Sequence, residues 1–185
     1  FHKEVNYNIK FTMLRKILIE PDPILRKKCD PLENVDTTTK KLMDDMLETM
    51  YSAPGIGLAA VQIGILKRIV VIDISKGEEK KNPLFLVNPE IMHQSKKTSV
   101  YEEGCLSLPE QFAEIERPAE CTLKYLDYNG KEKQLKADGL LATCIQHEVD
   151  HLNGILFIDY LSKLKKDMII KKLVKKKKET ERVIV

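Results

Sequence analysis

Residues 146–151 have the sequence Gln-His-Glu-Val-Asp-His, and this stretch decides how the rest of the chain is interpreted. On an α-helix, residues four apart lie on the same face, one turn from each other. His147 and His151 can therefore bind one ion together. Glu148 lies beside the first ligand, where its carboxylate can hold a water molecule on that ion. We predict a helix that binds a catalytic metal, in preference to a helix whose histidines are merely structural.

A catalytic site needs a third protein ligand and an open coordination position. Zinc peptidases that continue this motif with Gly and a third His are excluded, because Phe157 stands where that His would be. A downstream carboxylate, from Asp159 or Asp167, is a second option, but the pattern favours neither. Cys144 would have to reach past His147 on the same helical face, so we interpret it as a small buried side chain.

Cys105 is the preferred third ligand. It lies in the stretch Tyr-Glu-Glu-Gly-Cys-Leu-Ser-Leu-Pro over residues 101–109, which is typical of a loop between strands. Gly104 lets the backbone approach another element closely. A ligand from a separate element completes a tetrahedral site more readily than a second short side chain from the same helix.

The apolar pattern predicts an α+β fold with mostly antiparallel strands packed around a central metal-binding helix, followed by a C-terminal helix. Asn129-Gly130 is typical of a hairpin turn, and Asn88-Pro89 is expected to end a strand. The expected elements are helices over residues 37–51, 140–152 and 161–174, and strands over 69–74, 84–87, 121–128 and 131–135.

Neither an internal repeat nor a linker divides the chain. We therefore expect residues 1–185 to form a single catalytic domain, with an N-terminal extension over 1–12 and a basic tail over about 174–185. The 43% hydrophobic and 32% charged residues are typical of a globular protein in water, and the longest apolar runs are too short to span a bilayer. The four cysteines are widely spaced, which favours a reducing compartment over a disulfide framework.

Positive charge is concentrated near the C-terminus. Residues 163–182 contain ten Lys or Arg and three Asp or Glu, so this segment carries a net charge of +7 and the rest of the chain carries −4. Such a segment is most often a solvated face. The alternative is a patch that binds RNA or another polyanion.

Three segments together resemble the three signature motifs of the peptide deformylases. They are GIGLAAVQ over residues 55–62, EGCLS over 103–107 and QHEVDH over 146–151. All three are complete and stand in the order and at the separations usual for that family, and the resemblance extends from about Leu14 to Leu173. It implies a metal-dependent hydrolase that removes the formyl group from the N-terminal formyl-methionine of nascent polypeptides and releases formate.

The resemblance also implies the ligands and the metal. Cys105, His147 and His151 would bind one divalent ion, Fe(II) in vivo, with Zn, Ni or Co as alternatives. A thiolate with two imidazoles is compatible with several of these ions on chemical grounds alone.

The remaining site residues follow from the motifs and the expected chemistry. Glu148 would accept a proton from the attacking water and later pass it to the departing amine. The Gln62 amide and, by the family pattern, the Leu106 backbone N–H would stabilise the oxyanion. Gly55 and Gly57 would let the substrate backbone lie alongside like an added β-strand. By analogy with the family, the methionine pocket would be lined by Ile56, Leu140, Thr143 and Cys144. A structural role is expected for Glu103, paired with Arg117.

Two other functions fit parts of the pattern. A zinc endopeptidase would take a downstream carboxylate as its third ligand, and a small basic RNA- or ribosome-binding domain would hold a structural metal with four ligands. If the chain acts on nascent peptides, the basic C-terminal segment is the expected ribosome contact. We expect no membrane association. The expected location is the bacterial cytoplasm, with an organelle of bacterial origin as the alternative.

Overall fold

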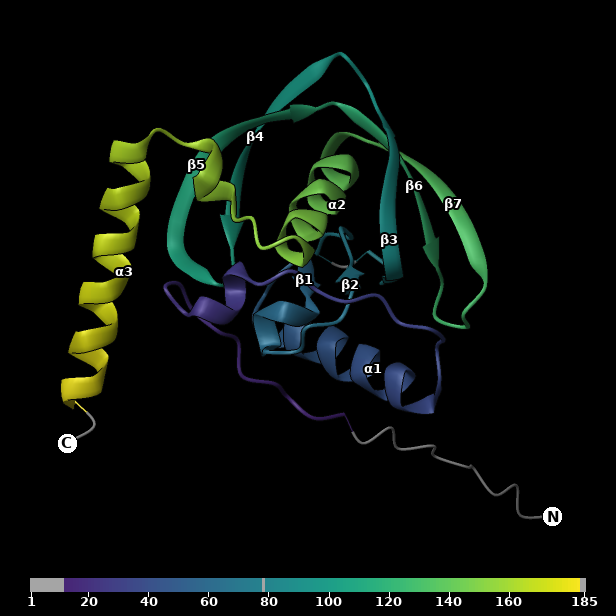
Figure 1. Ribbon diagram of the computed structural model, residues 1–185, viewed down its shortest axis with the longest axis horizontal. Helices are drawn as coiled ribbons and strands as arrows, with labels where there is room; N and C mark the ends of the chain where they lie inside the picture. Colours follow the sequence, from purple (N-terminus) through teal and green to yellow (C-terminus); the bar gives the residue numbers. More distant parts are fainter. Residues whose placement is uncertain (1–11, 78, 184–185) are drawn as a thin grey trace.

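The computed structural model describes residues 12–77 and 79–183, with the side chains described as far as residue 179. The predicted N-terminal extension over residues 1–12 therefore lies almost entirely outside the described residues. Figure 1 shows helix α2 enclosed by the strands, α1 below them and α3 at one side. This arrangement confirms the prediction of an α+β fold built around a central helix.

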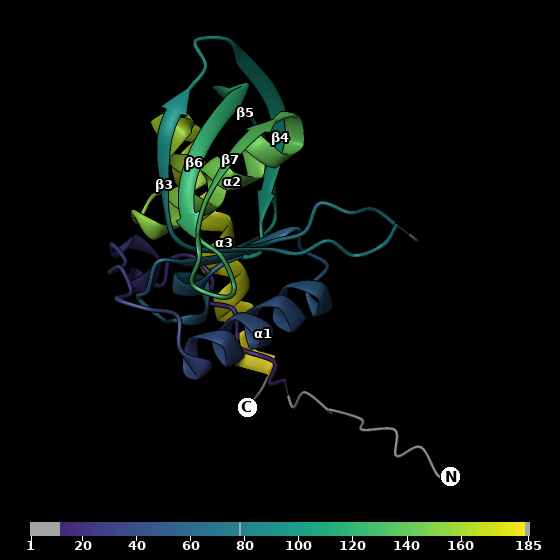
Figure 2. The same ribbon diagram turned by 90° about the vertical axis from the view of Figure 1, so that its right-hand side faces the viewer.

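In the part of the chain that the structure describes, seven antiparallel strands form two sheets. The larger sheet has the order β1 (Gly57–Ala59), β2 (Ile69–Ile72), β3 (Leu84–Gln94), β6 (Glu120–Leu126) and β7 (Glu132–Asp138). The smaller sheet is a hairpin of β4 (Thr98–Cys105) and β5 (Leu108–Pro118). In Figure 2, turned by 90° from Figure 1, β3, β6 and β7 and the β4–β5 hairpin rise together around α2. The hairpin thus brings residues 98–118 to the central helix.

Three α-helices and three short 3-10 helices complete the described chain. The α-helices are α1 (Thr37–Ser52), α2 (Gly139–Leu152) and α3 (Lys163–Val183), and the 3-10 helices are η1 (Pro23–Arg26), η2 (Ala60–Ile63) and η3 (Phe157–Tyr160). The first two α-helices match the predicted ranges to within one residue at each end. The third continues nine residues beyond the predicted end at 174, so the basic tail is helical as far as Val183.

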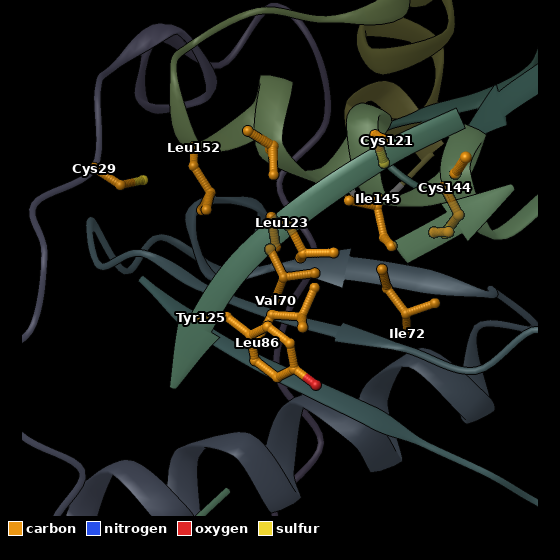
Figure 3. Packing of buried hydrophobic residues seen from close by; sticks show 14 of the residues in the cluster. Cys29, Val70, Ile72, Leu86, Cys121, Leu123, Tyr125, Cys144, Ile145 and Leu152 are labelled. Atoms are coloured by element: carbon orange, nitrogen blue, oxygen red, sulfur yellow. The ribbon is translucent and has the colours of Figure 1, made fainter. Parts of the chain in front are cut away.

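Strand β2 explains why the larger sheet is covered on both faces. Successive side chains of a strand point to opposite faces, and all four residues of β2 are buried. Val70 and Ile72 pack in the cluster that includes α2, whereas Ile69 and Val71 pack in the cluster that includes the methionines of α1. Figure 3 shows side chains from β2, β3, β6 and α2 converging in the first cluster. Helices α1 and α2 therefore lie on opposite faces of this sheet.

Two local predictions were wrong. Asn88-Pro89 does not end a strand, because β3 continues to Gln94 through an irregular register between Val87 and Glu90. Asn88 adopts a positive φ of 51° there, and its side-chain amide bonds both the N–H and the carbonyl of Leu32. A bulge of this kind accommodates a proline that cannot donate a ladder hydrogen bond.

The second error concerns residues 101–109, which are strand rather than loop. Cys105 is the last residue of β4, and the β4–β5 register shifts between Gly104 and Cys105. The strand was missed because charged residues interrupt the apolar alternation by which a half-buried strand is identified.

All four cysteines, Cys29, Cys105, Cys121 and Cys144, are free thiols.

Within the described residues, no helix is both long enough and apolar enough to cross a membrane.

Candidate metal centre

Three potential metal ligands meet at the centre of the molecule. His147 and His151 lie one turn apart on α2, and Cys105 faces them from the end of β4. One ligand atom from each of the three side chains lies within 4.8 Å of the others, and His151 Nε2 is 3.2 Å from Cys105 Sγ. The structure thus brings together the three residues that the sequence selected. Within the described residues this group offers three ligands, which leaves the open position that catalytic sites have.

The alternative ligands lie elsewhere. Asp159 forms ion pairs with Arg26 and Lys166, and Asp167 is a half-exposed residue near Lys163. Burial raises the pKa of the Cys144 thiol well above its usual value, which keeps it protonated. These observations favour Cys105 over each competing third ligand.

Glu103 connects the metal centre to a buried ion pair. His147 Nδ1 is 2.8 Å from Glu103 Oε2, so Nε2 is the ring nitrogen that can face an ion. Arg117 donates two hydrogen bonds to Glu103, at 2.5 and 3.0 Å. Burial alone would raise the pKa of Glu103, but the hydrogen bonds from His147 and Arg117 hold it below its usual value. The predicted Glu103–Arg117 pair is therefore present.

The ion pair extends further than the sequence indicated. Arg117 also donates to Asp150 Oδ2 at 2.7 Å, and the Tyr160 hydroxyl donates to the same oxygen at 2.8 Å. The ring of Tyr160 lies 4.7 Å from the guanidinium carbon of Arg117. The sequence offered no sign of this network, because its members come from β4, β5, α2 and η3.

Glu148 is buried beside the ligands with one oxygen unused. Its Oε2 atom is shielded from solvent and forms no hydrogen bond with the described protein atoms. Burial raises the pKa of this carboxyl to about 7, partly opposed by the positive charge of His147. A buried carboxylate oxygen without a partner costs free energy, and a water molecule held on a neighbouring ion would satisfy it. The residues present therefore fit a metal ion with bound water.

The charge state of His151 also suits a ligand. Burial lowers its pKa well below the usual value, and a protonated His147 lowers it further. The pKa of His147 is itself raised, despite burial, by its hydrogen bonds with Cys105 and Glu103, so this residue gives up a proton when an ion binds. The neutral imidazole is the form that binds metals.

Gly57 lies against Glu148, the predicted proton acceptor, and has no room for a side chain. A Cβ atom at this position would collide with Glu148 Oε1 and come within 3.0 Å of Cys144 Sγ. The sequence predicted that Gly57 makes room for a substrate backbone. In the structure it also makes room for the Glu148 carboxylate.

Gln62 is oriented by its neighbours. Its Oε1 atom accepts a hydrogen bond from the Ala59 N–H at 2.9 Å. Its Nε2 atom lies 3.1 Å from Ser107 Oγ and 3.5 Å from Cys105 Sγ. The side-chain amide is therefore beside the metal centre with its donor end toward it. Leu106, the other predicted oxyanion residue, directly follows Cys105, and its side chain packs against Gly55.

A cavity of about 380 Å³ opens beside the candidate ligands. Its walls include the five residues predicted to bind substrate, which are Ile56, Gly57, Leu140, Thr143 and Cys144. Glu148, His147 and Cys105 also line it. Another part of the wall comes from the β4–β5 hairpin and was not predicted, with Tyr101, Pro109 and Phe112 among its residues. Only the folding of the hairpin over α2 places that wall.

The chain resembles known proteins over most of its length. The sequence profile of the polypeptide deformylase family matches residues 14–167. A peptide deformylase of Pelagibacter ubique is 65% identical over 172 residues, which cover 93% of this chain and 99% of that protein. One from Rhizobium meliloti is 56% identical over 162 residues, covering 88% of this chain and 93% of that protein.

Solved structures agree with the sequence matches. The crystal structure of peptide deformylase from Ehrlichia chaffeensis superposes with a TM-score of 0.87 at 42% identity, covering 91% of this chain and 99% of that one. The complex of the Ehrlichia chaffeensis enzyme with actinonin gives a TM-score of 0.84 at 45% identity, covering 89% and 98%. The fold is thus shared with this group.

Proposed function

Because this chain belongs to the polypeptide deformylase family, whose members are metal-dependent hydrolases that remove the formyl group from N-terminal formyl-methionine, we propose that Cys105, His147 and His151 hold its catalytic metal ion. The observation that carries this proposal is the meeting of three ligand atoms within 4.8 Å, beside a buried carboxylate oxygen that has no protein partner among the described residues. Two of the three motifs supply these ligands, one from β4 and the other from α2.

The ion is Fe(II) in vivo, and Zn, Ni or Co can take its place. A thiolate with two imidazoles is a donor set that all four ions accept. When bound, a divalent ion lowers the pKa of water and so supplies a nucleophile at neutral pH.

Glu148 moves the proton. Its unpartnered Oε2 atom accepts a proton from the attacking water and returns it to the nitrogen of the departing amine. A carboxyl with a pKa near 7 is well matched to both steps at neutral pH. Gly57 supports this role, because any larger residue would displace the carboxylate.

Two N–H groups stabilise the developing negative charge on the formyl oxygen. One comes from the Gln62 side-chain amide, whose donor end lies 3.5 Å from Cys105 Sγ. The other is the backbone N–H of Leu106. Donors that are already in place when charge develops stabilise the transition state more than the substrate.

The methionine side chain of the substrate occupies the cavity. Its predicted lining by Ile56, Leu140, Thr143 and Cys144 is supported by the position of all four residues in the cavity wall. Strand β1 is an edge strand of the larger sheet. An edge strand can pair with an extended peptide, so the substrate backbone lies along Gly57.

The proposal extends to the setting of the reaction. The substrates are formyl-methionyl nascent peptides, residues 1–185 act as one catalytic domain, and the protein works in the bacterial cytoplasm. The exposed lysines of α3, from Lys175 to Lys178, contact the ribosome through its RNA phosphates.

Formate release from a formyl-Met peptide tests the central proposal. The protein is purified without oxygen, and its metal content is measured for the wild type and for Glu148→Ala. We expect wild-type turnover, a loss of about a hundredfold to ten-thousandfold in the variant, and equal metal content. Turnover by Glu148→Ala close to that of the wild type would remove the proposed role of Glu148. A full metal site without formate release by the wild type would contradict the proposed reaction.

A further inference from the structure

The side-chain amide of Gln62 has two N–H bonds, and the structure gives each of them an acceptor. The Ala59 backbone N–H can only donate, so the Gln62 oxygen must face it, at 2.9 Å. The nitrogen then faces the other way. One N–H is directed to Ser107 Oγ at 3.1 Å. The other points toward Cys105 Sγ at 3.5 Å and so faces the reaction centre.

Ser107 is itself held firmly. It is completely buried and lies between β4 and β5, two residues after Cys105. Its carbonyl oxygen accepts a hydrogen bond from the Glu20 N–H at 2.9 Å, and Glu20 pairs with Arg26. The backbone of Ser107 is therefore held in place and its hydroxyl is enclosed, in the same short segment as a candidate metal ligand.

We propose that Ser107 is a positioning residue for the reaction. It binds one N–H of the Gln62 amide and so aims the second N–H at the formyl oxygen. The terminal torsion of a glutamine side chain is broad, so an amide held only at its oxygen and by the long 3.5 Å contact with Cys105 Sγ would sample several directions. This inference depends on the proposed role of Gln62 and assigns a role to a residue that is neither a metal ligand nor part of the cavity wall.

Steady-state kinetics of Ser107→Ala test the inference. The substitution removes only a hydroxyl, and we expect kcat to fall by about tenfold with KM changed by less than about twofold. Loss of a whole oxyanion donor costs about a hundredfold to a thousandfold, and a misdirected donor should cost part of that. Metal content and thermal unfolding are measured on the same samples. An unchanged kcat in a folded, metal-loaded Ser107→Ala protein would overturn the inference.

Ser99→Ala is the matched control. The Ser99 hydroxyl oxygen is also shielded from solvent, but it has no hydrogen-bond partner among the described residues. Its removal should leave kcat unchanged. Equal losses of kcat in both variants would show a general effect of removing a buried hydroxyl from the hairpin and would overturn the inference. In Ser107→Thr, which keeps the hydroxyl, kcat should exceed that of Ser107→Ala.

A double-mutant cycle separates this inference from the role of Gln62. In a Gln62→Ala background, Ser107→Ala should lower kcat by less than about twofold, because the group that it positions is gone. A full tenfold loss in that background would overturn the inference alone. If Gln62→Ala itself keeps wild-type kcat, the proposed oxyanion role of Gln62 fails, and the inference fails with it.

Discussion

Helices α2 and α3 both carry many polar side chains, but they place them in opposite environments. Every residue of α2 from 142 to 149 is buried, including Gln146, His147 and Glu148. In α3, only Leu173 is buried among residues 163–179, and the lysines are exposed except for Lys166, which is half-buried against Asp159. Figure 1 shows the same contrast, with α2 enclosed and α3 standing at one side.

The contrast shows that a polar residue indicates a function mainly when it is buried. A buried polar group costs free energy unless it has a partner, so each one in α2 requires an explanation. Gln146 bonds Pro118 and Gln94 across the fold, and the remaining polar residues surround the metal centre. A lysine in water costs almost nothing and requires no partner. Substitutions should therefore have large effects around α2 and small ones along α3.

The largest effect is expected at Cys105. Cys105→Ala should lose both the bound metal and formate release, because only two ligands remain. Cys144→Ala is the matched control, since it removes a thiol three residues from His147 and should keep the metal. Metal per protein, measured by atomic emission, distinguishes the two variants. Metal retained in Cys105→Ala and lost in Cys144→Ala would reverse the ligand assignment.

A smaller effect is expected one step away from the metal, at Glu103. Glu103→Gln leaves the buried Arg117 without its full counter-charge and weakens the contact that orients His147. Metal affinity should fall by about tenfold to a hundredfold, and the free energy of unfolding should fall by about 3–5 kcal/mol.

Glu102→Gln provides the comparison for Glu103. Glu102 is the neighbouring residue on the exposed face of β4, so its substitution should change neither property. Competition with a chelator measures metal affinity, and unfolding by denaturant measures stability. Full metal affinity and full stability in Glu103→Gln would refute the structural role of this residue.

The smallest effect on catalysis is expected in α3. Deleting residues 174–185 keeps the buried Leu173, so turnover of a short formyl-Met peptide should stay within about twofold of the wild type. Cosedimentation with ribosomes should weaken, and the wild-type association should decrease as salt rises. The deletion also shortens the helix. A control in the full chain therefore removes only the charge, by replacing with Gln the residues Lys175, Lys176, Lys177 and Lys178. Undiminished cosedimentation of both proteins would remove the ribosome contact from the proposal.

Local signals were sufficient for much of the fold and of the site. The two histidines share one helical face because the α-helix repeats every 3.6 residues, and that relation needs no tertiary contact. The apolar stripe that contains Met43, Met46 and Met50 likewise predicted α1, and all three side chains are fully buried. The β4–β5 hairpin was missed because its inner face includes the Glu103–Arg117 pair, and sequence pattern alone cannot distinguish a buried ion pair from two exposed charges.

The sequence by itself determined which chemistry is available: a helix with two imidazoles and a carboxylate in one register, a cysteine that can join them, and the family motifs that contain all four. Only the tertiary structure decided which groups act on one another. Cys105 meets His151, Glu103 orients His147, Gly57 adjoins Glu148, and Ser107 holds Gln62. Each of these contacts joins residues that are more than 40 positions apart in the chain. Such contacts form only when the free energy gained by packing α2 between the two sheets offsets the entropy lost in closing the intervening loops.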